Sequence, residues 1–128
     1  MRKSVTLIIM LLCAFAAMAV PPKLATETIF SQKGIRSKGY KLVTNRCEAS
    51  YFRSVTAEKD KNLVKTIKKL VEKDSELAYN VVENSDENGN EYIILNILNN
   101  NELINVGFWW NDSGYAHLFV EGRPDAFK

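Results

Sequence analysis

Three apolar runs separated by short polar turns fill the stretch from Glu91 to Gly122, and they constrain the fold more than any other part of the sequence. In an extended strand successive side chains point to opposite faces, so each run can place a set of apolar residues on one buried face. The turn at residues 112–114 is typical of a hairpin with a G1 bulge, and the asparagine pair at 100–101 is typical of a two-residue hairpin loop. The sequence therefore predicts a three-stranded antiparallel meander.

The two turns also determine which residues pair across the strands, because side chains alternate between the faces. Counting outward from each turn pairs Phe108 with both Ile93 and Leu118, so that apolar residues lie opposite apolar residues. We expect this face to be buried against a helix. Its members are Ile93, Leu95, Ile97, Ile104, Val106, Phe108, Trp110, Ala116, Leu118 and Val120.

The opposite face of the predicted meander is rich in aromatic side chains and is the candidate binding site. In the predicted register Trp109 lies across from His117, and Phe119 lies across from Gly107, where a ring covers bare backbone. This face is too aromatic for an ordinary wet surface and too polar for a deep core. Either another element partly covers it, or it is a platform for a ligand or partner. The candidate site residues are Tyr92, Trp109, Tyr115, His117 and Phe119.

The first residues are typical of an export signal. Basic residues at positions 2–3 precede an apolar run at 5–17, and the small residues at 17–19 fit a cleavage site near Ala19. The apolar run is too short for a transmembrane helix, and no later stretch is long enough. The sequence predicts a signal peptide over residues 1–19 and a single α+β domain over residues 20–128. The expected location is the periplasm or the cell surface.

Charge and cysteine content narrow the classes of function. Without Arg2 and Lys3 of the leader, acidic and basic residues are equal in number, so neither nucleic acid nor an anionic membrane is an expected partner. Cleavage would leave Cys47 as the only cysteine, which excludes an intramolecular disulfide.

The strongest helical pattern runs from Lys61 to Lys73, where the apolar residues share one side and Asp60 is the candidate N-cap. A short amphipathic helix is expected over residues 24–33. A second helical piece is expected from Ser75, although its two adjacent valines fit the start of a strand equally well.

Extended runs at residues 40–44 and 49–56 complete the predicted elements. The expected fold is α+β, with a single antiparallel sheet of about five strands that includes the C-terminal meander. Two to three helices are expected to pack on one face of that sheet.

The loop at residues 85–90 contains the one pattern that resembles a metal site. Asp86, Asn88 and Asn90 offer oxygen atoms at alternate positions, as a calcium loop does at its start. The glycine, however, stands at position four of the pattern rather than six, and position twelve is Ile97 rather than an acid. We expect no metal and no other cofactor.

Four short segments, at residues 38–43, 52–56, 67–74 and 118–122, carry a resemblance to a known group of proteins. They are a strand containing Lys and Gly, a strand of aromatic, basic and Ser residues, a Lys-rich helix end, and a closing strand that ends in Glu-Gly. In these features the chain resembles small exported domains of unknown function from Bacteroidetes-type bacteria. The resemblance implies periplasmic or surface residence, and it carries no catalytic residue to transfer.

The function these features favour is that of an exported, non-enzymatic binding module that uses its aromatic face to hold a protein or a glycan. One alternative is a structural subunit of a cell-envelope assembly, with the aromatic face covered by the second helical piece. Another is a small hydrolase that uses Cys47 and His117, the only possible thiol and imidazole pair, oriented by Asn105 or Glu121. No spacing in the sequence brings that pair together.

Overall fold

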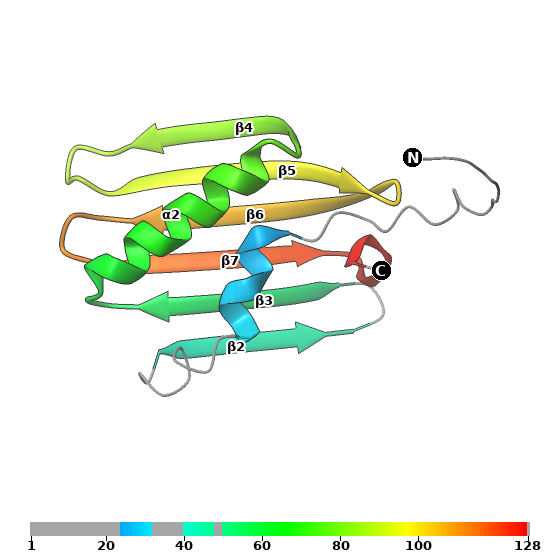
Figure 1. The fold of residues 1–128 in the computed structure, drawn as a ribbon, viewed down its shortest axis with the longest axis horizontal. Coiled ribbons are helices and arrows are strands. Elements are labelled where there is room, and N and C mark those ends of the chain that lie inside the picture. Colours follow the sequence, from blue (N-terminus) through cyan, green and yellow to red (C-terminus); the bar gives the residue numbers. More distant parts are fainter. Residues whose placement is uncertain (1–23, 32–39, 48–49, 128) are drawn as a thin grey trace, which may run out of the picture.

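The computed structural model describes residues 24–31, 40–47 and 50–127, so the expected leader over residues 1–19 lies outside the described residues. Six strands form one antiparallel sheet in the order β2-β3-β7-β6-β5-β4 (Figure 1). The strands are β2 (Lys41–Arg46), β3 (Tyr51–Ala57), β4 (Ala78–Ser85), β5 (Glu91–Asn99), β6 (Glu102–Trp110) and β7 (Ala116–Gly122).

The residue pairing predicted across both hairpins is confirmed. Phe108 pairs with Ile93 on β5 and with Leu118 on β7, and the rest of the predicted pairs follow. Asn100 and Asn101 both have positive φ angles, of 55° and 60°, which is the geometry of a type I′ turn. Gly114 also has a positive φ, of 101°, as the predicted bulge requires.

The predicted fold is wrong in its helices and in the extent of its meander. The six strands of the sheet are close to the predicted number of about five, but the meander extends to a fourth consecutive strand, because β4 pairs with β5. The described residues contain one α-helix, together with the 3-10 helices η2 (Ala25–Ser31) and η3 (Pro124–Phe127). The second helical piece expected from Ser75 is therefore a strand. Its two valines pair with Leu95 and Ile94 of β5, which would otherwise be the edge strand of the sheet.

The α-helix α2 (Lys61–Ser75) matches its predicted start and runs two residues past its predicted end. Asp60 caps it, because its carboxylate accepts a hydrogen bond of 2.9 Å from the backbone N–H of Leu63. The apolar side of the helix lies on the sheet, where Ile67 and Val71 are buried.

The short helix η2 lies on the same side of the sheet as α2 (Figure 1). Asp74 of α2 holds its first turn: the buried carboxylate accepts hydrogen bonds from the backbone N–H groups of Ala25 and Thr26, at 2.6 and 2.9 Å, and from Oγ1 of Thr26 at 2.7 Å. Arg53 on β3 forms an ion pair with Glu27 of η2. These contacts fix η2 across the sheet.

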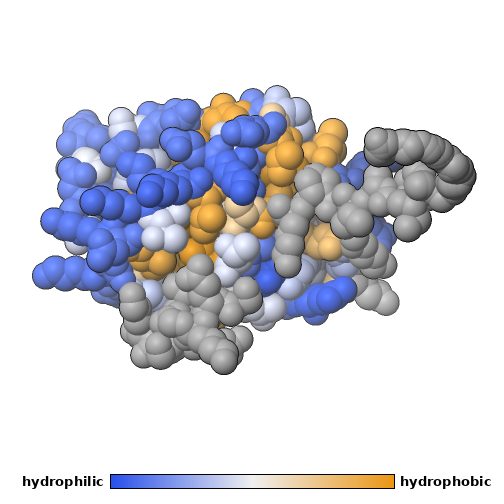
Figure 2. All heavy atoms as spheres, in the orientation of Figure 1, coloured by the Kyte–Doolittle hydropathy of each residue, from blue (hydrophilic) through white to orange (hydrophobic). Residues whose placement is uncertain are grey.

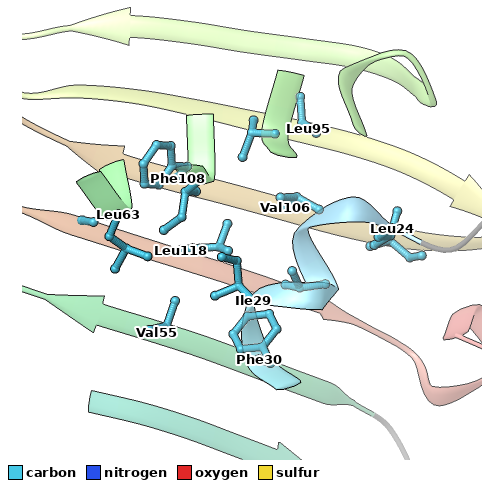
Figure 3. Close-up of a cluster of buried hydrophobic side chains, with 14 of the residues drawn as sticks. Leu24, Ile29, Phe30, Val55, Leu63, Leu95, Val106, Phe108 and Leu118 are labelled. Carbon is cyan, nitrogen blue, oxygen red and sulfur yellow. The ribbon is translucent and has the colours of Figure 1, made fainter. Parts of the chain in front are cut away.

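The hydrophobic core lies between these helices and one face of the sheet (Figure 3). Phe108, Val106 and Leu118 from the centre of the sheet are fully buried, and Ile29 and Phe30 of η2 pack against the same cluster. The core face is the face predicted from the turns of the meander.

The outer surface of this helical layer is largely hydrophilic, with hydrophobic residues visible where α2 gives way to β4 (Figure 2). The five lysines of α2 lie outside its buried stripe and are exposed. Among the described residues, no helix combines the length and the apolar character needed to cross a membrane.

Candidate functional site

The candidate site is the face of the sheet that points away from α2 and η2. Because side chains alternate along each strand, Trp109 points to this face while its neighbours Phe108 and Trp110 point to the helical side. The second helical piece, which one alternative placed over the aromatic face, is the strand β4 and lies in the plane of the sheet instead. The described helices α2 and η2 therefore leave this face open.

Residues at the same level on neighbouring strands form rows across the open face. One row consists of Asn84, Tyr92, Trp109, His117 and Thr56, from β4 to β3. The next consists of Val82, Ile94, Gly107, Phe119 and Ser54, and the third of Asn80, Asn96, Asn105, Glu121 and Phe52.

Four aromatic rings from four strands form a continuous series on this face. Phe52 on β3 stacks on Phe119 with ring centroids 6.0 Å apart, and Phe119 stacks on Trp109 at 5.6 Å. Trp109 in turn stacks on Tyr92 at 5.8 Å. His117 lies at the side of this series, 6.0 Å from Trp109. We call Phe52, Phe119, Trp109 and Tyr92 the aromatic series.

The rings of the series overlap only in part. Their planes differ by 20° to 27°, so each pair is close to parallel. Two superposed rings in van der Waals contact would be about 3.5 to 4 Å apart, so the larger centroid distances mean that each ring is displaced sideways from the next. All four side chains are half-buried. The series therefore leaves part of each ring surface accessible.

Gly107 allows Phe119 to lie close to the backbone at the centre of the series. A Cβ atom at this position would lie 2.6 Å from Cζ of Phe119 and 2.9 Å from Cζ3 of Trp109, both closer than real Cβ contacts. The prediction that a ring covers bare backbone here is confirmed by this contact. A glycine is thus required for the observed ring positions.

His117 is held in place by β3. Its Nδ1 atom lies 2.7 Å from Oγ1 of Thr56, which pairs with it across the strands. Partial burial lowers the pKa of His117 below 6.5, because the charged imidazolium loses hydration there. The ring is therefore neutral at neutral pH, and its nitrogen atoms act as one donor and one acceptor.

A hollow of about 490 Å³ opens over the rings near one end of the series. Its walls combine aromatic surface with polar atoms and are formed by Phe52, Trp109, Tyr115, His117, Phe119 and Glu121. A second hollow, of about 380 Å³, lies on the other side of Tyr115 and Trp109 and reaches Asp86 and Asn90. Tyr115 and Trp109 line both hollows.

The loop beside the second hollow is held by its own side chains. The Asp86 carboxylate accepts hydrogen bonds from the backbone N–H groups of Asn88 and Asn90 and from the Asn90 side chain, at 2.8 to 3.0 Å. These bonds, that of the Asn90 side chain foremost, lower the pKa of Asp86 below its usual value. The alternating oxygen atoms of the calcium-like pattern are thus arranged as a turn.

Asparagine side chains continue the polar part of the open face. Asn80 donates from Nδ2 to Oδ1 of Asn96 at 2.8 Å, and Asn96 donates to Oδ1 of Asn105 at 2.7 Å. The amides thus form a ladder across β4, β5 and β6. Charged residues on the described part of this face are few, namely Lys41 on the outer strand β2 and Glu121 on β7.

The structure brings all five predicted site residues together, and it adds Phe52, which the sequence interpretation missed. Phe52 belongs to β3, whose pairing with β7 joins residues 51–57 to residues 116–122. The alternation along β3 predicts that Phe52 shares a face of the strand with Ser54 and Thr56, but no local turn reveals which strand lies beside β3. The sequence therefore indicates the face on which Phe52 lies but not its neighbours on that face.

Cys47 and His117 are not brought together. Cys47 is exposed in the turn after β2, next to the end of β3 where Tyr51 pairs with Gly122. His117 pairs with Thr56 at the other end of β3, five residues along the strand, which corresponds to about 16 Å. A direct proton transfer between this thiol and this imidazole is excluded by that separation.

Taken together, the fold and the site define a small two-layer domain, in which helices cover one face of an antiparallel sheet and an aromatic series occupies the other. The chain belongs to a family of unknown function, DUF6108, whose family model matches residues 12–112. The match ends in the turn before β7. Searches of curated proteins and of solved structures found no match to this chain.

Proposed function

We propose that this protein is an exported binding module that holds a neutral glycan on the open face of its sheet. The observation that carries the proposal is the aromatic series, in which four offset rings from four strands offer accessible surface in one continuous series of stacked pairs. Flat rings bind the apolar C–H faces of sugars well, because they supply contact area with few torsions to restrict.

The polar groups around the rings support a glycan over other ligands. The asparagine ladder supplies amide donors and acceptors, which suit hydroxyl groups. His117 is neutral at neutral pH, so its nitrogen atoms suit the same purpose. Within the described strands, Lys41 and Glu121 are the only charged residues on this face, so we expect the ligand to carry little or no charge.

In this proposal the first sugar unit binds in the larger hollow. Its volume of about 490 Å³ falls within the range of small-molecule sites, and its lining combines the rings with the polar residues Tyr115 and Glu121. A chain that leaves this hollow along the aromatic series would pass Trp109 and reach Tyr92 at the β5 side.

Export is part of the proposal. The basic start, apolar run and small-residue site in residues 1–19 support it, and so does the resemblance to exported Bacteroidetes-type domains. Residence in the periplasm or on the cell surface would place the open face where envelope and environmental glycans occur.

The test is a glycan array probed with the wild-type protein and two variants. Trp109→Ala removes the ring that contacts three others of the open face, so binding should fall at least tenfold. Leu98→Ala is the matched control, because Leu98 is exposed near the far end of the same face and should leave binding unchanged.

The outcomes separate the possible partners. A glycan signal that Trp109→Ala abolishes and Leu98→Ala keeps supports the proposal. An empty array, with a wild-type protein shown to be folded by its circular dichroism, contradicts it. If a purified envelope protein then binds and Trp109→Ala prevents that binding, the face holds a protein, which is the other partner expected from the sequence for a binding module.

A further inference from the structure

Beyond the open face, the outer edge of β4 has only two of the features with which proteins protect sheet edges, a register shift between Ala78 and Asn80 and the charge of Glu83. The strand is eight residues long, and Tyr79, Val81 and Val82 are 62%, 40% and 43% exposed. Its single charged residue is Glu83, and it contains no lysine and no proline. The opposite edge strand, β2, is shorter and begins and ends with the basic residues Lys41 and Arg46.

The type I′ turn between β5 and β6 reveals which backbone groups of β4 point outward. In such a turn the flanking residues Asn99 and Glu102 bond to each other, so every second residue of β5 from Asn99 back directs its N–H and C=O to β6. The residues between them direct theirs to β4.

The same alternation continues into β4. Asn80, Val82 and Asn84 pair with the residues of β5 that face β4, so their backbone groups are used within the sheet. The N–H and C=O groups of Val81 and Glu83 therefore point away from the sheet. No other described strand pairs with this edge.

These outward groups fit a second copy of the same strand. In an antiparallel pair about a two-fold axis at Val82, Val81 and Glu83 of each copy exchange hydrogen bonds with Glu83 and Val81 of the other, which gives about four backbone bonds. Val82 lies against Val82 of the partner subunit, and Asn80 lies against Asn84 of the partner subunit. Apolar residues thus meet apolar residues, and amides meet amides.

The two neighbouring registers fit less well. An axis at Glu83 would place the two Glu83 carboxylates directly opposite each other, which is unfavourable. An axis at Val81 would place the amide of Asn80 against the partner's Val82. In the register with its axis at Val82, the two Glu83 residues are diagonal neighbours instead, farther apart than an opposed pair.

We propose that the protein forms a symmetric dimer in which β4 pairs antiparallel with β4 of a second copy, with the two-fold axis at Val82. The two sheets become one continuous sheet, and their open faces lie on the same side. The asparagine ladder of one copy then leads through Asn84 of the partner subunit into the partner's aromatic series. The dimer would present two aromatic series on one surface.

Disulfide cross-linking tests both the dimer and its register. Three variants of the full chain, Val81→Cys, Val82→Cys and Glu83→Cys, are prepared with Cys47→Ser to remove the exposed native thiol. Opposed residues in the proposed register have Cα atoms about 4.5 Å apart at Val82, which a disulfide spans. The same distance at Val81 and at Glu83 is roughly 8 Å, which a disulfide does not span.

Mild oxidation should therefore convert Val82→Cys to a covalent dimer and leave the other two variants monomeric. Cross-linking chiefly at Val81→Cys or at Glu83→Cys, equal cross-linking at all three, or none at all would overturn the proposal. Sedimentation of the Cys47→Ser protein without oxidation should give twice the monomer mass. Val82→Lys should return it to the monomer mass, because two lysines would then be opposed at the axis, and a dimer that persists in this variant contradicts the proposed contact.

Discussion

Asp74 allows the sharpest prediction about stability, because a single carboxylate holds η2 to α2. The side chain is 1% exposed and accepts three hydrogen bonds, two of them from the fully buried Thr26. Asp74→Ala removes all three acceptors and leaves buried donors without partners. Each such donor costs about 1 to 3 kcal/mol, and hydrogen bonds to charged groups are at the upper end of the range.

The expected loss for Asp74→Ala is therefore about 3 to 5 kcal/mol. Detachment of η2 would not restore this free energy, because Ile29 and Phe30 would then leave the core. For a domain of about a hundred residues, the loss corresponds to a decrease in Tm of roughly 15 to 25 °C. Thermal and urea unfolding followed by circular dichroism measure both quantities.

Two further variants make the measurement specific. Glu72→Ala is the matched control, because Glu72 is exposed on the same helix, and its replacement should change stability by less than about 0.5 kcal/mol. Thr26→Val removes one of the three donors and should cost less than Asp74→Ala, with an effect that does not add to it. If Asp74→Ala unfolds like Glu72→Ala, the proposed role of the carboxylate is refuted.

Three other predictions follow from the site and its supports. Because the folded state lowers the pKa of His117, the unfolded state binds more protons just below pH 6.5, so the free energy of unfolding should rise with pH up to about 6.5. Urea unfolding at several pH values should show that His117→Gln lacks this contribution. If the variant keeps the same dependence of unfolding free energy on pH, the prediction is contradicted. Gly107→Ala should displace the rings of Phe119 and Trp109, which should weaken glycan binding on the array and lower the unfolding free energy by about 1 to 2 kcal/mol. Unchanged glycan binding by this variant would show that the ring positions are unimportant. Asp60→Ala should cost about 1 kcal/mol of stability through loss of the helix cap, and a melting curve identical to wild type would exclude that role.

The parts of the fold that could be predicted are those determined by local sequence. Gly114 and the two asparagines at 100–101 specify their turns, and the turns specify the pairing of β5, β6 and β7. The candidate face followed directly from that pairing. Asp60 and the apolar stripe after it likewise specify α2 within a few residues of its ends.

The remaining features depend on contacts between distant segments. The apolar residues at 77, 78, 81 and 82 fit one side of a helix as well as they fit a strand, and only pairing with β5 makes the segment a strand. The partner of β3 is β7, about sixty residues away along the chain, so the place of Phe52 in the aromatic series could not be derived from turns. The short η2 depends in the same way on Asp74, far along the chain.

The most direct test of the central claim is the fluorescence of Trp109 in the Trp110→Phe variant, quenched with acrylamide. The open face predicts that acrylamide quenches Trp109 readily in the free protein. It also predicts that a neutral oligosaccharide, from a panel built on glucose, mannose, xylose and N-acetylglucosamine, reduces the quenching in a saturable way. Shielding of Trp109 in the free protein, or quenching that no member of the panel changes, would contradict the proposal that this aromatic face binds glycans.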